Sequence, residues 1–464
     1  MNMHRLSGFD ASLLYLESSS QPMNTCTLME LDTSTMTEGY AFDVFRSKLS
    51  VLIPALPEFR MKLADSRMNL DTPVWVEDPN FELDQHLHRV AWPAPCGRRE
   101  LSEVAGRLVA GLMDRDRPLW DMWVIDDASP TDPTGGGRVA VMLRIHHALV
   151  DAVTAGNLMA RLCSTEIAPE APAPAEGVGT VSKRAIIFDG MRGFASRPRH
   201  LVSEVLPASV SAIRKTLRRA ADGRAMPSPM TAPRTPFNGN ITQDRTVAYT
   251  QLELDDVKAI KSAFDVKLND VMLALLAGAL RRYLTDRAAL PQASLVAMMP
   301  ISVFDSDRSS RNQMSAMFSR LFTHIAEPAD RLKAIAEATS TAKQHSSELG
   351  ATLLQDWTQH APGSLAMIMR LYRWSGLSAR RPAYNVSLSN VHGHEVQCYL
   401  LGAAITGRYP LGPLLNGVGL NVSVVSLNGK LDVGLVACPQ LLPDLWDLAD
   451  NLHIALKELL EATT

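Results

Sequence analysis

The chain has 464 residues, a formal net charge of −3 and only 6% aromatic residues. A chain of this length is too long to fold around one hydrophobic core, so the length predicts two domains or one fold with two lobes. The near-neutral charge and the scarcity of stacking side chains argue against a nucleic-acid partner. Five cysteines stand singly, without CxxC or paired histidine spacing, so the sequence predicts neither a disulfide scaffold nor a metal site.

The sequence also predicts a protein that does not span a membrane. Residues 1–20 lack the basic region, apolar run and cleavage site of a signal peptide. The longest apolar stretch, residues 271–280, is about half as long as a membrane-spanning helix. We therefore expect a cytoplasmic location, with peripheral contact to the inner membrane or to lipid droplets left open.

The first part of the chain mixes strand-like and helix-like patterns. Residues 26–31 and the apolar run 139–145 predict strands, the second of them buried on both faces. Residues 101–113 carry apolar side chains at helical spacing, and a further helix is expected after His147. These elements predict an N-terminal lobe over residues 1–167.

The composition changes abruptly in the middle of the chain. Residues 168–177 are rich in Pro, Ala and Glu, which is typical of an extended linker. Residues 183–224 then combine ten basic residues with three acidic ones and with regularly spaced apolar residues. Two interpretations stay open here: a helical connector with a solvated face, or an amphipathic surface for anionic lipid. We assign residues 168–243 to this linker and crossover.

The remaining residues, 244–464, predict a C-terminal lobe. Strands are expected at residues 247–254, 295–300, 385–388, 420–427 and 431–436, and helices at residues 255–264, 271–284 and 445–459. Asn428 and Gly429 separate the last two strands, and this dipeptide is typical of a two-residue hairpin turn.

The stretch from Arg144 to Ala152 carries the chemistry, because it contains His146, His147 and Asp151. A neutral imidazole at the open end of a buried strand suits the deprotonation of an alcohol. Transfer of an acyl group from a thioester needs such a base and oxyanion donors but no nucleophilic Ser or Cys, and the chain has no GxSxG motif. The pattern alone also fits a structural histidine pair or metal ligands, although no further ligand stands at suitable spacing.

Several motifs along the chain, taken in order, resemble the bacterial wax ester synthase/diacylglycerol acyltransferase family. They are LSGFD at residues 6–10, PM at 22–23, WVED at 75–78, FELDQH at 81–86, RPLW at 117–120, HHALVDA at 146–152, ND at 269–270, SNV at 389–391 and GLNV at 419–422. The resemblance implies the α/β fold of the chloramphenicol acetyltransferase-like, coenzyme A-dependent acyltransferases. That fold has two lobes with mixed sheets, and a tunnel between them admits acyl-CoA and the alcohol from opposite sides.

The resemblance also implies roles for the residues of the central motif. His147 would be the general base, His146 would support its geometry, and Asp151 would be a structural residue that orients the loop. No bound cofactor and no metal are implied, because acyl-CoA would be a co-substrate. The contacts to the coenzyme A phosphates stay unassigned, since no glycine-rich phosphate loop is present.

Four further residues are implied to border the substrate. Asn269 and Asp270 stand where a helix begins, so N-capping explains them equally well. Ser389 and Asn390 offer hydroxyl and amide donors to the tunnel, but a turn at a strand end favours the same residue types.

The chain departs from the family pattern at five positions. Ala152 replaces the usual Gly, His392 and His394 replace two prolines, Phe304 stands where Arg is usual, and Asn24 stands where many members have His. These changes leave the expected base intact, but they put full activity and the usual substrate range in question.

The leading hypothesis is transfer of a long-chain acyl group from acyl-CoA to diacylglycerol, or to a fatty alcohol. A second hypothesis is acyl transfer to another alcohol or amine, as in condensation domains that share the HHxxxDG signature. A third is a degenerate member that binds lipid or acyl-CoA without turnover. Acceptor, acyl length and oligomeric state are not determined by the sequence.

Overall fold

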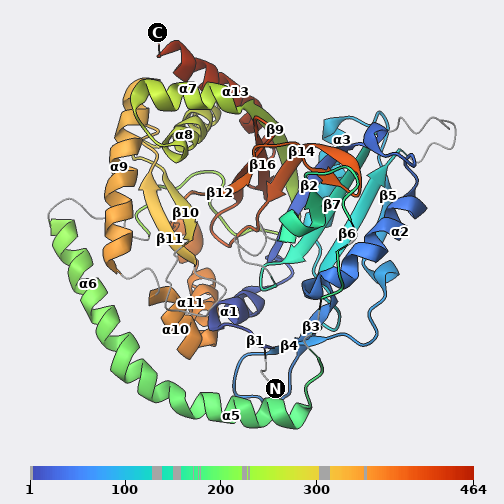
Figure 1. Cartoon of the computed structure of the whole chain (residues 1–464). Helices are drawn as coiled ribbons and strands as arrows, with labels where there is room; N and C mark the ends of the chain where they lie inside the picture. Colours follow the sequence, from blue (N-terminus) through green and yellow to red (C-terminus); the bar gives the residue numbers. More distant parts are fainter. Residues whose placement is uncertain are drawn as a thin grey trace.

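The computed structural model describes residues 4–127, 138–149, 158–170, 172–175, 177, 179–221, 227, 230–302, 314–349 and 353–463. Two large mixed β-sheets, each with helices packed on it, form two lobes that lie side by side (Figure 1). The expected two-lobed α/β fold with mixed sheets is therefore confirmed. The tunnel between the lobes stays a prediction.

The first lobe is built on a seven-stranded sheet. Its spatial order is β5 (Leu87–Ala91), β6 (Trp120–Asp126), β7 (Val139–His146), β2 (Asn24–Asp32), β14 (Ala403–Leu411), β13 (Tyr399–Leu400) and β8 (Cys163–Ser164). Only the β5–β6 pair is parallel. A smaller sheet of β1 (His4–Arg5), β4 (Val74–Glu77) and β3 (Met61–Ala64) lies below it in Figure 1.

Strand β7 is buried on both faces, as its unbroken apolar run predicts. Alternate residues of a strand point to opposite faces. Val141 and Leu143 therefore join the core beneath helix α2 (Phe42–Leu52), whereas Ala140 and Met142 join the core beneath helix α3 (Arg98–Val109). With a hydrophobic core on each side, the strand holds its C-terminal end in a defined place.

The second lobe is built on a six-stranded sheet. Its spatial order is β11 (Met314–Arg320), β10 (Val296–Ser302), β12 (Val386–His394), β15 (Leu420–Leu427), β16 (Lys430–Ala437) and β9 (Thr246–Glu253). Its helices are α7 (Leu254–Phe264), α8 (Leu268–Asp286), α9 (Pro328–Leu349) and α13 (Leu445–Glu461). Helix α8 is the centre of this core and packs against α7, α9 and α13.

Helices α1 (Gly8–Leu16), α10 (Leu353–His360) and α11 (Pro362–Trp374) lie between and below the sheets in Figure 1, and the short helix α12 (Leu377–Arg380) follows α11 in the chain. Although α1 lies near the start of the chain, it packs on α10 and α11 from the C-terminal half.

The strands and helices expected from the sequence are confirmed, with ends that differ by a few residues. The hairpin is also confirmed, because Leu427 pairs with Lys430 and both turn residues have the positive φ of such a turn, 46° at Asn428 and 75° at Gly429. Residues 158–162 are helical, as expected after His147.

The first sheet is not built from the N-terminal segment alone. Strands β13 and β14 come from the C-terminal half but complete the first sheet, where β14 pairs with β2. The boundaries 1–167, 168–243 and 244–464 stay a prediction, and strand pairing couples the outer two segments.

The basic segment is helical and forms a long curved strap. It consists of α5 (Lys183–His200), the π-helical turn η5 (Leu201–Val205) and α6 (Leu206–Ala221). In Figure 1 this strap runs along the bottom of the first lobe and up the outer side of the second. It connects the lobes, as a crossover is expected to do.

Candidate active site

The two histidines lie at the end of strand β7, in a turn that several hydrogen bonds hold in place. His146 is the last residue of the strand and pairs with Asn24 of β2. The backbone N–H of His147 donates to the Met23 carbonyl at 2.8 Å, and the backbone N–H of Leu149 donates to the His146 carbonyl at 2.9 Å. The backbone on both sides of His147 is therefore fixed by hydrogen bonds.

The His146 side chain is fully buried and reinforces this turn from inside. Its Nδ1 accepts a hydrogen bond from the backbone N–H of Ala148 at 3.0 Å. A neutral imidazole with an accepting Nδ1 carries its proton on Nε2. That nitrogen lies 3.3 Å from Oε1 of Glu17, just beyond helix α1. His146 thus has a defined tautomer and a carboxylate partner.

Glu17 is buried and ionised at this position. Burial opposes its ionisation, but hydrogen bonds from His146 and Arg115, together with the charge of Arg115, lower its pKa from 4.5 to about 2. The Arg115 guanidinium donates to Glu17 Oε2 at 2.8 Å, and the Met23 N–H donates to Oε1 at 3.3 Å. One carboxylate therefore links the His146 ring to Met23, whose carbonyl also holds the His147 backbone.

His147 differs from its neighbour in exposure. The residue is partly exposed, whereas its Nδ1 atom is buried. A ligand can therefore approach the ring only through its other atoms, Nε2 among them. Asp151 and Ala152, the other notable residues of the motif, lie outside the described residues.

The RPLW motif supports the same turn from the neighbouring strand. The carbonyl of Leu119 accepts from the His146 N–H at 3.0 Å. Trp120 is buried, donates from Nε1 to the Phe59 carbonyl at 2.8 Å and stacks on His86 with centroids 4.8 Å apart. This motif packs the lobe and fixes the backbone beside the histidines.

The second group of expected site residues lies on the other sheet. Asn269 opens helix α8, and its Oδ1 accepts a hydrogen bond from Nδ2 of Asn390 in β12. Ser389 precedes it in β12 and is partly exposed. The structure thus brings together Asn269 and Asn390, which are 121 residues apart in the sequence.

Asp270 faces inward and is used by the fold. Its Oδ2 accepts from the backbone N–H of Lys267 at 3.0 Å, and its Oδ1 accepts from the Thr339 hydroxyl at 2.6 Å. These bonds satisfy an otherwise unpaired amide at the start of α8 and tie that helix to α9. Both oxygens of the carboxylate are occupied, so the capping role predicted for Asp270 is confirmed.

Three of the five departures from the family pattern have a described backbone. Asn24 is buried beside His146 and donates from Nδ2 to the Gly111 carbonyl at 2.7 Å. His392 and His394 belong to β12, but their side chains lie outside the described residues, as does all of Phe304.

Glu17 and Arg115 are the residues that sequence reasoning missed. They lie 98 positions apart, and neither belongs to a recognisable spacing pattern with His146. Only the packing of α1 beside the end of β7 brings the three together.

The described part of the chain offers no group of three or more His, Cys, Asp or Glu side chains that could hold a metal ion. Burial raises the pKa of the Cys26 and Cys163 thiols to about 12, so neither is a nucleophilic thiolate at neutral pH. Within the same residues, every helix is too short or too polar to cross a membrane.

Two family models match this chain. Residues 6–272 match the wax ester synthase/diacylglycerol acyltransferase catalytic domain, and residues 311–460 match the WS/DGAT C-terminal domain. Together they cover both lobes.

Comparison with individual proteins supports the same family assignment. A Mycobacterium tuberculosis protein whose name proposes diacylglycerol O-acyltransferase activity is 50% identical over 463 residues, which cover 99% of this chain and 91% of that protein. Another from the same organism is 33% identical over 98% of this chain and 99% of its own. The solved wax ester synthase/diacylglycerol acyltransferase of Marinobacter aquaeolei superimposes with a TM-score of 0.71 at 26% identity, covering 99% of this chain and all of that one.

The fold extends to more distant enzymes. A starter condensation domain of rhizomide synthetase, solved in complex with C8-CoA, superimposes with a TM-score of 0.52 at 15% identity, covering all of this chain and 95% of that one. At this identity the similarity shows the shared fold alone.

Proposed function

The chain belongs to the wax ester synthase/diacylglycerol acyltransferase family and is an acyltransferase, and from this premise we propose that it moves a long-chain acyl group from acyl-CoA to diacylglycerol. The product would be triacylglycerol. A fatty alcohol in place of diacylglycerol would give a wax ester by the same chemistry. No bound cofactor takes part, because acyl-CoA brings the activated carbonyl.

His147 is the general base in this proposal. The acceptor hydroxyl gives its proton to Nε2 of His147 as its oxygen attacks the thioester carbonyl carbon. The carbon–sulfur bond then breaks, and the imidazolium returns the proton to the departing coenzyme A thiolate. No covalent enzyme intermediate forms, so the two substrates must be bound together.

One observation carries the proposal: hydrogen bonds fix the backbone of His147 at the end of a strand buried on both faces, while the residue itself is partly exposed. A base must be held in place to be effective, because misplacement by about 1 Å can reduce the rate about 100-fold. The hydrogen bonds to Met23 and around His146 supply this restraint. His146 is the supporting residue in this arrangement, and Asp151 keeps its proposed orienting role.

The asparagine pair on the second lobe is the proposed substrate contact. Asn269, Asn390 and the adjacent Ser389 present amide and hydroxyl groups that could orient the thioester or the acceptor. Asp270 would act indirectly, by fixing the start of α8 beneath Asn269. Because diacylglycerol resides in membranes and lipid droplets, the enzyme would meet its acceptor at such a surface.

The test is acyl transfer by the His147→Ala variant. Labelled palmitoyl-CoA is incubated with separate pools of diacylglycerol, long-chain alcohol and lysolipid. We expect wild-type protein to label triacylglycerol and the variant to be slower by about 10² to 10⁴-fold, with an unchanged circular dichroism spectrum.

His88→Ala is the matched control, because His88 is a partly exposed histidine of the same sheet. It should keep wild-type activity. Wild-type ester formation by His147→Ala would refute the mechanism, and transfer only to another pool would refute the acceptor.

A further inference from the structure

The strap carries a row of aliphatic side chains that point to solvent. Val202, Leu206, Val210, Ile213 and Leu217 follow one another at intervals of three or four residues, which places them on one face of the helix. Each is between 44% and 67% exposed. We call these five residues the strap stripe.

The strap stripe is not the face by which the helix packs. Val205 and Ala212 are the buried residues of this region, and Ser209 between them accepts a hydrogen bond from Trp357 Nε1 of α10 at 2.8 Å. At 100° per residue, this packing face lies about a quarter turn away from the stripe. The helix therefore packs on the rest of the protein with one face, and its second apolar face, the stripe, is exposed.

Cations flank the stripe on its outer side. Arg214 and Arg218 lie next to the stripe, on the side of the helix away from the packing face. Together with stripe residues they line a shallow hollow of about 620 Å³. Neither guanidinium has an ion-pair partner among the described residues. The whole strap carries nine basic and two acidic residues within a chain of net charge −3, so positive charge is concentrated on this element.

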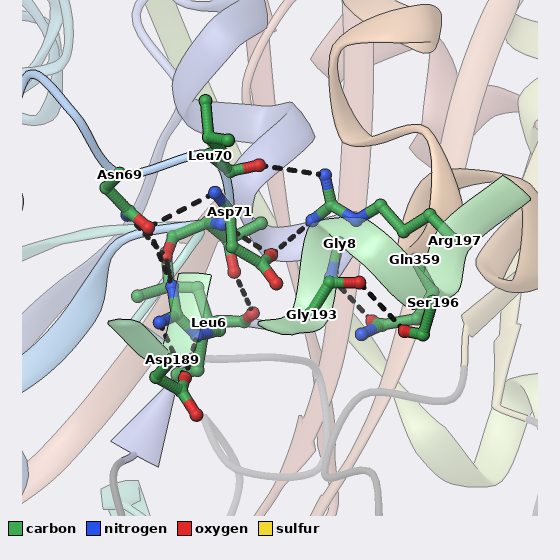
Figure 2. A network of polar contacts seen from close by, with 12 residues as sticks. Leu6, Gly8, Asn69, Leu70, Asp71, Asp189, Gly193, Ser196, Arg197 and Gln359 are labelled. Carbon is green, nitrogen blue, oxygen red and sulfur yellow. Dashed lines mark hydrogen bonds and ion pairs between the residues drawn. The ribbon is translucent and has the colours of Figure 1, made fainter. Parts of the chain in front are cut away.

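The strap is firmly attached, so the stripe is a fixed part of the surface. Arg197 reaches from α5 to the Asp71 carboxylate and the Leu70 carbonyl (Figure 2). Asp189 pairs with Arg5 at 2.7 Å. A Cβ on Gly193 would lie 2.2 Å from Asp71 Oδ2, so a larger residue there would displace the carboxylate that pairs with Arg197.

From these observations we propose that the strap stripe docks the enzyme on an anionic phospholipid surface. The aliphatic side chains enter the boundary between headgroups and acyl chains, while Arg214 and Arg218 contact headgroup phosphates. A second copy of this chain fits the stripe poorly, since a two-fold contact would bring these cations together. The inference rests on the proposed function to the extent that the acceptor is a lipid in such a surface.

The first experiment measures co-sedimentation with vesicles. Wild-type protein is mixed with vesicles of phosphatidylcholine containing about one third phosphatidylglycerol, and with pure phosphatidylcholine vesicles. Binding should be strong to the first and about tenfold weaker to the second, and high salt should weaken it because surface charges are screened.

The second experiment compares two serine variants. In the stripe variant, Leu206, Val210, Ile213 and Leu217 are all replaced by Ser, which should weaken vesicle binding by about tenfold or more. In the control variant, Val51, Met68, Leu112 and Val396 are replaced by Ser. These residues are similarly exposed but lie outside the strap, so binding should be unchanged.

The charge contribution is tested by Arg214→Gln combined with Arg218→Gln. This variant should bind phosphatidylglycerol vesicles several-fold more weakly and should respond less to salt. Light scattering of wild type and stripe variant checks for self-association. A dimer that dissociates in the stripe variant, together with no vesicle binding, would overturn the proposal.

Docking and catalysis can fail independently. His147→Ala should bind vesicles as wild type does, which would support docking by a surface separate from the base. Wild-type protein that binds vesicles but transfers no acyl group would refute the proposed function and support docking. Equal vesicle binding by wild type and stripe variant would overturn docking, whatever the activity.

Discussion

His146, the residue beside the proposed base, is held by the buried carboxylate of Glu17. His146 receives a backbone N–H on one ring nitrogen and faces Glu17 with the other, at 3.3 Å. Glu17 in turn is paired with Arg115. This chain of contacts holds the turn that carries His147, and we therefore propose that Glu17 is a positioning residue and not a catalytic one.

We predict that Glu17→Gln lowers kcat by about 10- to 100-fold and leaves KM nearly unchanged, because the base is displaced while the substrate contacts persist. Steady-state kinetics with palmitoyl-CoA separate the two parameters. The exposed Glu103→Gln serves as the control and should behave as wild type. A change confined to KM would contradict a positioning role.

The same variant should alter the pH dependence of stability. The folded pKa of Glu17 is about 2 and its ordinary value is 4.5, so between these values the unfolded chain binds more protons than the folded one. Stability from this group is complete above about pH 4.5 and is lost as the pH falls towards 2. Urea unfolding of wild type between about pH 6 and pH 3 should show a loss on the order of 2 kcal/mol that Glu17→Gln lacks.

At the scale of the element, the start of helix α8 places two adjacent side chains in different surroundings. Asp270 points inward to Lys267 and Thr339, whereas Asn269 is exposed and contacts Asn390. A helix start leaves amide groups unpaired, and a carboxylate there also meets the positive end of the helix dipole. Asp270 is therefore used by the fold, whereas Asn269 stays free for the substrate contact that we propose.

We predict that Asp270→Ala lowers the free energy of unfolding by about 2 kcal/mol, since it removes the cap and the buried hydrogen bond with the Thr339 hydroxyl of α9. Asn269→Ala, one position away, should change stability by less than about 0.5 kcal/mol. It should instead raise KM severalfold if the asparagine pair contacts substrate. Urea denaturation and kinetics on both variants distinguish these outcomes.

At the scale of the molecule, a buried cluster joins the two lobes. Glu30 of β2 accepts hydrogen bonds from Tyr409 of β14 at 2.9 Å and from Tyr249 of β9 at 3.3 Å. The two tyrosine rings lie 4.3 Å apart, and the Arg98 guanidinium stands 4.7 Å from the centre of the Tyr249 ring. Burial, followed by the charge of Glu30, raises the pKa of both tyrosines, so they stay protonated as donors. One carboxylate thus connects the two sheets.

We predict that Glu30→Ala destabilises the protein by about 2 to 4 kcal/mol, because it leaves two buried hydroxyls unpaired. Loss of coupling between the lobes should also broaden the thermal transition seen by calorimetry. Glu103→Ala, on the exposed side of α3, is the control. A wild-type transition in Glu30→Ala would show that apolar packing alone joins the lobes.

Much of the local structure follows from the sequence. The apolar run of β7 predicts its burial, the Asn428–Gly429 pair predicts the hairpin, and the histidine motif predicts where the site begins. The roles of Glu17 and Arg115 could not be predicted, because no periodicity relates them to His146. The same holds for the contact between Asn269 and Asn390, which depends on how α8 lies against β12.

The sequence by itself determined the strands and helices with clear apolar patterns, the family motifs and the basic character of the strap, since each depends on residues near one another in the chain. Tertiary structure alone decided that β14 completes the first sheet, that Glu17 faces His146, and that the strap leaves five aliphatic residues uncovered. These features depend on contacts between distant segments, and such contacts are selected by the packing of the whole fold and not by any local pattern.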